Sequence, residues 1–513
     1  MRKFLMASAA TLGAVSIAGA ASAQTTPPPT FLEGQVATTP SASPPAYANT
    51  NNAYQGGPAL PGAIAIPTPG TFVIKLNVAV VVEASLQSSS VSTYTQPAAP
   101  AGAGTGAVAF ATAGGTYKQN VQSFQSYVRL YPGLDAMATN GLRYGAGVEV
   151  RENFSSTTPA GGNLNGTSAS SFTSAQTLFV RRNFVYVAGD QWGIVRFGQA
   201  DGVTGIFDNG VTSFQSVSPS GGMNGSDVQT PIPGNMYMGF PFPAQNGVEY
   251  GNEKLVYLSP QFFGFDIGLQ YAPSNNNAEY TGAECTNGTT SDPSVLGATG
   301  VNAAYCSTTS SSPLASDAAR YTNQVVAGLR YQGTFGPVSA LVWGAYEASG
   351  IVDYTGAAPA VLHSGTFNGK YNGLSFGDFG AALTVAGLTF GGTVLTGAVN
   401  NNSQVNPQPQ GGAKETAFLI GFQYNYGPLA AGFAYEQADS QGAPALSGIT
   451  QRHEWGLNPG IDWVVAPGLK VFAEYFYGQR HQGDFNFATG GVGSTAYNDV
   501  RAQAFLVGSR VYW

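Results

Sequence analysis

The chain has 513 residues, of which only 9% are charged, while 12% are aromatic and 69 are glycines. A water-soluble globular protein usually carries about 25% charged residues. This composition therefore argues against a surface that is solvated by water everywhere, and it indicates a large surface that faces lipid. The formal net charge of −7 makes nucleic acid an implausible partner, because binding to phosphates requires an excess of clustered basic side chains.

The N-terminus has the features of a bacterial signal peptide. The basic pair Arg2 and Lys3 precedes a short apolar, alanine-rich run, and the sequence ASA at 21–23 matches a cleavage site. We expect residues 1–23 to direct export and the mature chain to begin at Gln24, with a formal charge of −9 because both basic residues leave with the leader. The run is too short for a transmembrane helix, and no stretch of about 18 apolar residues follows it.

Residues 24–70 are rich in proline, and no period of 2 or 3.6 residues persists in them. Such sequences are typical of extended linkers. We expect this segment to be a periplasmic linker or tail that precedes the first strand.

From Thr71 to the C-terminus, apolar and polar residues alternate in segments that predict strands with one apolar face. In FDIGLQY at 265–271, for example, the apolar residues occupy the odd positions and D, G and Q the even ones. The pattern predicts strands at 71–85, 121–131, 141–154, 176–189, 193–200, 251–260, 264–272, 321–332, 337–348, 375–386, 388–398, 414–426, 428–437, 452–465, 468–481 and 499–513.

The connections between these strands alternate between short turns and long polar loops. Tight turns are expected at Ala386-Gly387, Gly427-Pro428 and 466–468, among others. A β-sandwich would also show alternation, but its apolar face is a packed core, whereas many faces here end in Tyr, Trp or Phe, as membrane-interface belts do. We therefore predict an all-β fold: a transmembrane antiparallel up-and-down β-barrel of 16 strands, with short periplasmic turns and long extracellular loops.

Three segments carry a family resemblance: RRNFVYVAGDQWGIVRFGQ at 181–199, EKLVYLSPQFFGFDIGLQYAP at 253–273, and the terminal VYW. Through them the chain resembles the sixteen-stranded, trimeric general-diffusion porins of Gram-negative bacteria, over roughly 71–513. The resemblance implies a homotrimer in the outer membrane, in contact with lipid and lipopolysaccharide, that conducts small hydrophilic solutes and ions. Such porins usually end on Phe, which the barrel-assembly machinery reads; here Trp513 is expected to serve instead.

The resemblance also implies a constriction, because in such porins the loop after the fifth strand folds into the barrel and its acidic residues face arginines of the opposite wall. The corresponding loop covers about 201–250, and its acidic residues are Asp201, Asp208, Asp227 and Glu249. The expected basic wall consists of Arg129, Arg143, Arg151 and Arg196. The alternative is that these charges are simply solvated. Arg181 and Arg182 are consecutive, so one of them must face outward, a position that a subunit interface would tolerate.

The two cysteines, Cys285 and Cys306, lie in one Ser/Thr/Asn/Gly-rich stretch after the seventh predicted strand. In an exported protein we expect a disulfide that closes a surface loop. A metal site would need further His or carboxylate neighbours, and only Glu284 is adjacent. We therefore expect no metal.

No catalytic pattern is present in the sequence. The three histidines do not form H-E-x-x-H, and the glycine-rich run at 102–106 has no following helix. The one G-x-S-x-G match, GLSFG at 373–377, runs into the predicted strand at 375–386 and is not followed by a helix, so it does not form a nucleophile elbow. We expect no enzyme, no catalytic residue and no cofactor. A remote alternative is a barrel-embedded hydrolase that uses His453 or His481, and another is an adhesin that uses the long loops.

A closer alternative is a solute-selective channel, for example for sugars. Such a channel would carry a ladder of aromatic side chains along the lumen, and Trp343, Phe472 and Phe476 are the candidates.

Overall fold

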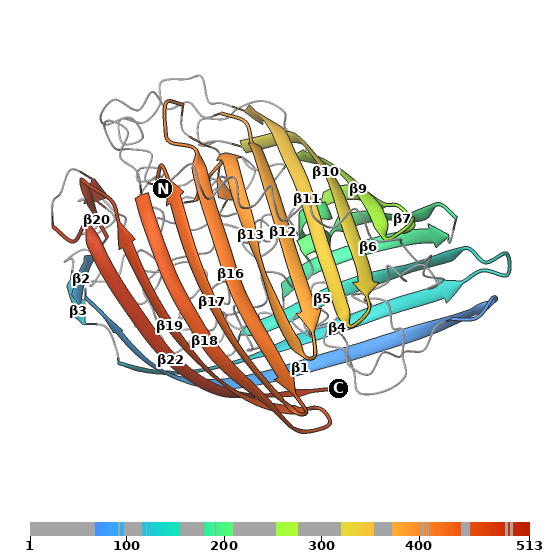
Figure 1. Ribbon diagram of the computed structural model, residues 1–513, viewed down its shortest axis with the longest axis horizontal. Helices are drawn as coiled ribbons and strands as arrows, with labels where there is room; N and C mark the ends of the chain where they lie inside the picture. The colour runs from blue at the N-terminus through green and yellow to red at the C-terminus, as the bar shows by residue number, and fades with distance from the viewer. Residues whose placement is uncertain are drawn as a thin grey trace, which may run out of the picture.

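The computed structural model describes residues 67–90, 93–96, 115–118, 121–153, 179–189, 191–208, 253–274, 320–352, 372–401, 405–406, 408, 410–442, 452–487, 491–492 and 496–513. Within them, 16 antiparallel strands close into one barrel (Figure 1). The predicted fold class is confirmed.

Each barrel strand pairs with its neighbours in chain order. The first eight are β1 (Thr71–Ser89), β4 (Gln122–Met137), β5 (Arg143–Asn153), β6 (Phe179–Gly189), β7 (Gly193–Gln199), β8 (Glu253–Leu258), β9 (Phe265–Ser274) and β10 (Arg320–Phe335). The others are β11 (Val338–Val352), β12 (Ser375–Val385), β13 (Leu388–Ala398), β16 (Glu415–Tyr426), β17 (Leu429–Ser440), β18 (Arg452–Ala466), β19 (Leu469–His481) and β22 (Asp499–Tyr512).

Smaller elements complete the described chain. Three two-stranded sheets pair β2 (Thr93–Gln96) with β3 (Gly115–Lys118), β14 (Asn400–Asn401) with β15 (Val405–Asn406), and β20 (Phe485–Asn486) with β21 (Gly491–Val492). The helix among the described residues is α3 (Val203–Asp208). No helix in this part of the chain has the length and apolar character that a membrane crossing requires.

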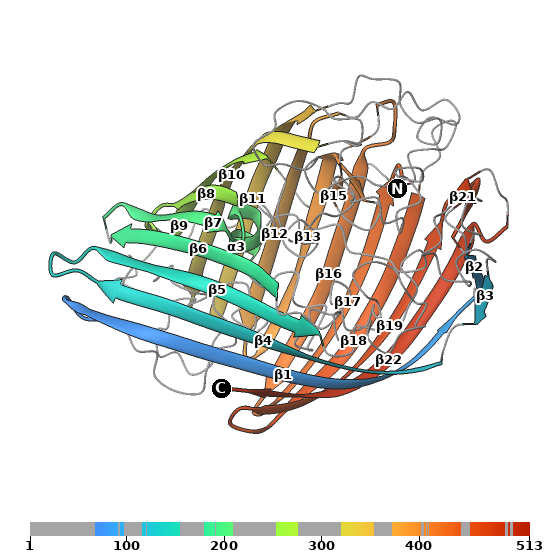
Figure 2. The same ribbon diagram turned by 180° about the vertical axis from the view of Figure 1, so that it is seen from behind.

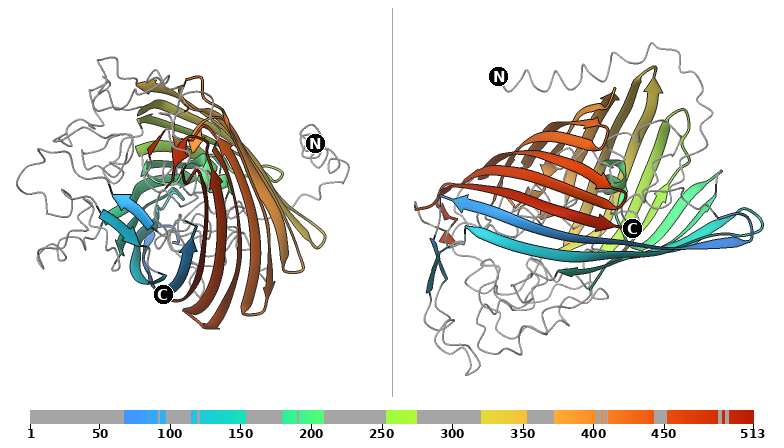
Figure 3. Two further views of the ribbon diagram at one scale, coloured as in Figure 1. Left: turned by 90° about the vertical axis from the view of Figure 1, so that its left-hand side faces the viewer. Right: turned by 90° about the horizontal axis from the view of Figure 1, so that it is seen from below.

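The barrel is closed by its first and last strands, β1 and β22, which lie side by side (Figure 3). At the seam, the Val78 N–H donates to the Trp513 carbonyl over 2.9 Å, and the Trp513 N–H donates back to the Val78 carbonyl over 3.1 Å. The C-terminal residue therefore contributes to the ladder that removes the open sheet edge.

Alternation divides the wall into an apolar outer face and a polar inner face. Outward residues such as Ile74 and Phe124 are 72% and 77% exposed, whereas the inward Glu83 and Arg182 are each 2% exposed. This pattern is the reverse of that in a soluble protein, and it fits a barrel whose outside contacts lipid.

Seven short turns share one rim of the barrel with the start of β1 and the end of β22. In the β12–β13 turn, Ala386 and Gly387 both have positive φ angles, 49° and 82°, as the tightest hairpins require. Aromatic side chains are exposed beside these turns, among them Trp192, Tyr426 and Trp513. A belt of this kind is typical of the level of the lipid headgroups.

Candidate constriction site

The helix α3 lies inside the barrel, shortly after the end of β7 (Figure 2). It contacts the inner faces of β9, β10 and β11. The chain therefore turns inward immediately after the fifth barrel strand, at the start of the connection that was expected to narrow the channel.

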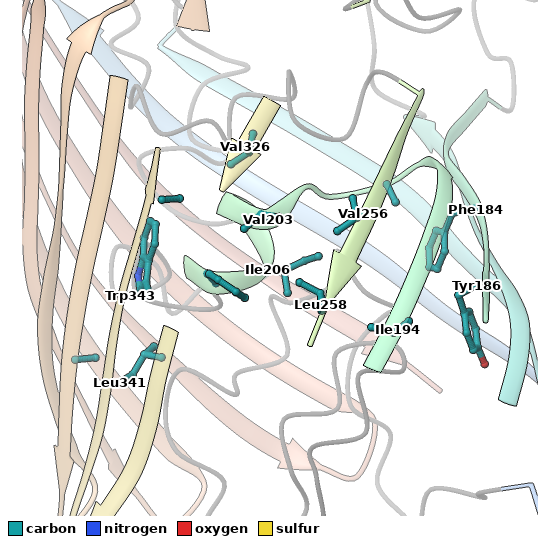
Figure 4. Packing of buried hydrophobic residues seen from close by; sticks show 14 residues of the cluster. Phe184, Tyr186, Ile194, Val203, Ile206, Val256, Leu258, Val326, Leu341 and Trp343 are labelled. Atoms are coloured by element: carbon teal, nitrogen blue, oxygen red, sulfur yellow. The ribbon is translucent and has the colours of Figure 1, made fainter. Parts of the chain in front are cut away.

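An apolar cluster holds α3 against the wall. Val203, Ile206 and Phe207 are at most 4% exposed, and they pack with wall residues of β8, β10 and β11 (Figure 4). Trp343 of β11, at 2% exposure, belongs to this cluster. Its ring is therefore covered by packing and does not form part of an open aromatic ladder.

Two wall glycines make room for the helix. A Cβ atom at Gly268 would lie 2.6 Å from Val203 Cγ1 and 2.9 Å from Phe207 Cζ. A Cβ atom at Gly328 would lie 2.8 Å from Val203 Cγ1 and 3.0 Å from Phe207 Cδ2. Any larger side chain at either position would push α3 away from the wall.

Charged and amide side chains of the wall bind the backbone just before α3 and within it. Lys254 Nζ donates to the Ala200 carbonyl over 2.7 Å, and the Val203 N–H donates to Gln270 Oε1 over 2.9 Å. These bonds satisfy backbone groups that have no partner within the helix.

Arg330 provides the anchor at the far end of α3. Its Nη1 donates to the Ile206 carbonyl over 3.3 Å, and its guanidinium carbon lies 4.8 Å from the centre of the Phe207 ring. Asp266 orients the guanidinium by accepting bonds of 3.1 Å from Nε and 2.6 Å from Nη2. The fork geometry of arginine allows these contacts to be made together.

Asp201 is held by an arginine of the neighbouring wall. Arg182 of β6 donates to Asp201 Oδ1 from Nη2 over 3.1 Å and from Nε over 3.3 Å, and it also bonds Glu149 of β5. All three side chains are at most 2% exposed. One guanidinium therefore compensates two carboxylates, and Asp201 does not face an arginine across the lumen.

Three arginines of the expected basic wall also have close neighbours. Arg143 bonds Asp135 through Nη2 over 2.9 Å, and the guanidinium of Arg196 lies 4.3 Å from the centre of the Phe184 ring. Arg129 lies 4.5 Å from the Tyr127 ring. These side chains belong to the inner face, and each contacts another side chain of the wall.

A family comparison decides what this barrel is. The model of the family described as Gram-negative porin matches residues 7–484. The chain belongs to the Gram-negative porin family. As a porin, it forms an outer-membrane channel for passive diffusion.

Solved structures similar to this porin include other outer-membrane proteins. An anion-selective porin from Comamonas acidovorans has 13% identity and a TM-score of 0.46, with 86% of this chain and 100% of the other covered. OmpF of Salmonella typhi, in complex with daunomycin, has 14% identity, a TM-score of 0.46 and coverages of 86% and 97%. OmpT of Vibrio cholerae, in a trimer form, has 12% identity and a TM-score of 0.44, with 86% of this chain and 99% of the other covered. No curated protein sequence matches the porin.

Several predicted site residues lie where their side chains are not described. Asp227 and Glu249 are outside the described residues of the porin, as are Cys285 and Cys306. Asp208 ends α3, and Arg151 lies in β5 beside Arg129 of β4, but only their backbone is described.

Residues that the sequence did not single out carry much of the contact. Lys254, Asp266 and Arg330 were missed, although strand alternation places all three on the inner face. Alternation gives the direction of a side chain but not its partner. The contacts of Arg330 with α3, of Lys254 with Ala200 and of Asp266 with Arg330 therefore had no signal in the sequence. Of the consecutive pair, Arg182 is the one that points inward.

The two histidines in described segments of the porin lie on the outer face. His453 Nδ1 lies 2.5 Å from Asp439 Oδ1, and His481 Nδ1 lies 3.9 Å from Asp499 Oδ2. Within the described residues, no group of three or more His, Cys, Asp or Glu side chains is arranged to hold a metal ion.

Proposed function

We propose that this porin is a general-diffusion channel for small hydrophilic solutes and ions, narrowed by the connection that begins at Asp201. The observation that carries this proposal is the position of α3 on the inner wall, where apolar packing, Lys254, Gln270 and Arg330 all hold it. A segment anchored in this way reduces the width of the lumen at one level. Solutes would pass according to size and charge without a dedicated binding reaction.

The charges of this segment and of the nearby wall would set the ion preference. Asp208, Asp227, Glu249 and the basic wall remain candidates for the narrowest part. At about 0.15 M salt the Debye length is about 8 Å, so charges at the narrowest point act more strongly than charges on a wide rim. We expect a weak cation preference that increases as the salt concentration falls.

The assembly is proposed to be a homotrimer in contact with lipid and lipopolysaccharide. In support, the outer faces of the first two barrel strands expose several large apolar side chains, including Phe72, Leu76 and Phe124 at 61% to 77%. A patch of this kind suits either lipid or a second subunit. Residues 1–23 are proposed to direct export, 24–70 to remain in the periplasm, and Trp513 to be read by the barrel-assembly machinery.

The cysteine pair is proposed to form a disulfide between Cys285 and Cys306. Mass spectrometry of the unreduced mature protein would show a mass two hydrogens below that of the reduced chain. Two free thiols would refute the pairing.

Conductance across a planar lipid bilayer tests the proposed channel. The purified protein should give stable, ohmic single-channel steps, and a series of uncharged sugars of rising size should permeate liposomes at falling rates. A channel that admitted one sugar far faster than others of equal size would instead be solute-selective. Membrane-inserted protein with no conductance would refute a diffusion pore and favour an adhesin.

A further inference from the structure

Four ionisable side chains form a row across the outer face of the barrel, at the rim opposite the short turns. The strands that carry them, β17, β18, β19 and β22, lie side by side (Figure 1), and the register pairs His453 of β18 directly with His481 of β19. On the β17 side, Asp439 pairs with His453. On the β22 side, Asp499 pairs with His481. Directly paired residues share one face of a sheet, so the two histidines are immediate neighbours and each has an aspartate on its other side.

This row is accessible from outside the barrel. The side chains of His453 and His481 are 45% and 50% exposed, and those of Asp439 and Asp499 are 30% and 44% exposed. Unlike the buried charges of the inner wall, they are within reach of a dissolved ion. Arg501 contacts the row as well, with its Nε 3.9 Å from Asp499 Oδ1. Two carboxylates and one guanidinium give the row a formal charge of −1 when both imidazoles are neutral, which favours a cation.

The aspartates orient the two imidazole rings. His453 Nδ1 lies 2.5 Å from Asp439 Oδ1, so in the neutral ring Nδ1 donates to the carboxylate and Nε2 keeps its lone pair. His481 Nδ1 lies 3.9 Å from Asp499 Oδ2, which is too long for a hydrogen bond but places the same edge of the ring beside the carboxylate. Because Nε2 lies on the other edge of the ring from Nδ1, each Nε2 is turned away from its aspartate and toward the strand of the other histidine.

The two Nε2 atoms are available as ligands. Neither of them hydrogen-bonds to another group in the described part of the chain. The Cβ atoms of directly opposed residues are about 4.5–5.5 Å apart. Rotation of the side chains therefore suffices to bring both Nε2 atoms to one metal ion at about 2.0–2.1 Å. A carboxylate behind a ligating imidazole is also the usual partner of metal-bound histidine, because it fixes the ring and makes the ligand nitrogen more basic.

We propose that His453 and His481 bind a divalent transition-metal ion such as Zn²⁺, with Asp439 and Asp499 as positioning residues. Imidazole nitrogen suits Zn²⁺, Cu²⁺ and Ni²⁺, whereas Mg²⁺ and Ca²⁺ prefer oxygen ligands. Within the described residues the histidines and acids form no cage of three or more ligands, so water fills the remaining coordination positions of the ion. The site is thus open to the medium, and because it lies on the outer face it is independent of the proposed channel function.

Zn²⁺ binding by the full-length mature protein in detergent, measured against a competing colorimetric chelator, tests the site. The unmodified protein should bind one ion that His453→Ala and His481→Ala each lose, because each substitution removes one of the two ligands. Asp439→Asn should weaken binding by about tenfold, the lower end of the effect of changing a carboxylate behind a metal-bound histidine. The matched control is His363→Ala, which removes the third histidine of the chain and should leave the ion bound. Zn²⁺ bound elsewhere would be common to all variants.

Cu²⁺ in place of Zn²⁺ shows whether the imidazoles themselves are ligands, because its EPR spectrum reports the nitrogen nuclei coupled to the metal. The unmodified protein should show two coupled nitrogens, and this signal should disappear in either single variant. Each variant is first shown to be folded by the heat-modifiable electrophoretic mobility of a closed barrel. A bound ion or a two-nitrogen signal that survives in both His453→Ala and His481→Ala would overturn the site, as would loss of the ion in His363→Ala. Neither measurement requires conductance, so a failure of the proposed channel would be recognised separately.

Discussion

The anchoring of α3 by Arg330 makes a quantitative prediction for channel behaviour. Replacement of Arg330 by Met removes the bond to the Ile206 carbonyl and the contact with the Phe207 ring. Asp266 would be left as a buried, unpaired carboxylate, so it is changed to Asn in the same variant. The double variant then isolates the loss of the anchor from the cost of an uncompensated charge.

The expected magnitude follows from the two lost contacts. A hydrogen bond from a charged donor contributes about 1.5 kcal/mol at the lower limit of its range, and we use this value because Arg330 Nη1 and the Ile206 carbonyl oxygen are 3.3 Å apart. A desolvated cation–π contact contributes about 2 kcal/mol. A total of roughly 3.5 kcal/mol corresponds to about a 300-fold change in the docking equilibrium of α3. The remaining anchors, Lys254, Gln270 and the apolar cluster, should keep the helix docked most of the time.

Single-channel recording detects this change directly. Each undocking event should appear as a transient change in conductance, and the fraction of time spent in that state should rise by about 300-fold. The matched control replaces Lys470 by Met and Asp462 by Asn, a buried pair joined over 2.9 Å on β19 and β18, which are not among the strands β9, β10 and β11 that α3 packs against. Unchanged dwell times in the Arg330 variant, with the barrel still folded, would refute the assigned role.

Three further predictions use the same assay. Substitution of Arg143, Arg151 and Arg196 together by Ser should raise cation preference and conductance, and an unchanged reversal potential would show that these arginines do not line the narrowest part. Gly328→Val should weaken the docking of α3 as the Arg330 variant does, because even a Cβ atom at this position would lie 2.8 Å from Val203 Cγ1 of the helix. Dwell times equal to those of the unmodified protein would contradict this. Deletion of 25–65 should leave assembly and conductance nearly unchanged, since the segment has no periodic apolar face; loss of insertion would make it structural.

Sequence alternation was sufficient to predict the barrel. A strand has a period of two residues, and a membrane barrel requires one face of every strand to be apolar. The position of each strand and the direction of its side chains can therefore be predicted from the local sequence. The predicted strands at 388–398 and 193–200, for instance, match β13 and β7 within a residue. The inward direction of Arg143 and Glu149 follows from the same parity.

The pairings between inner-face side chains required the tertiary structure. Arg182 reaches Asp201 only because the chain turns back into the barrel after β7, and the β5–β6 register places Arg182 opposite Glu149. The fit of α3 over Gly268 likewise depends on two segments far apart in sequence. Alternation specifies which face a side chain occupies, whereas its partner depends on strand register and on the path of an inserted segment, and neither has a local signature.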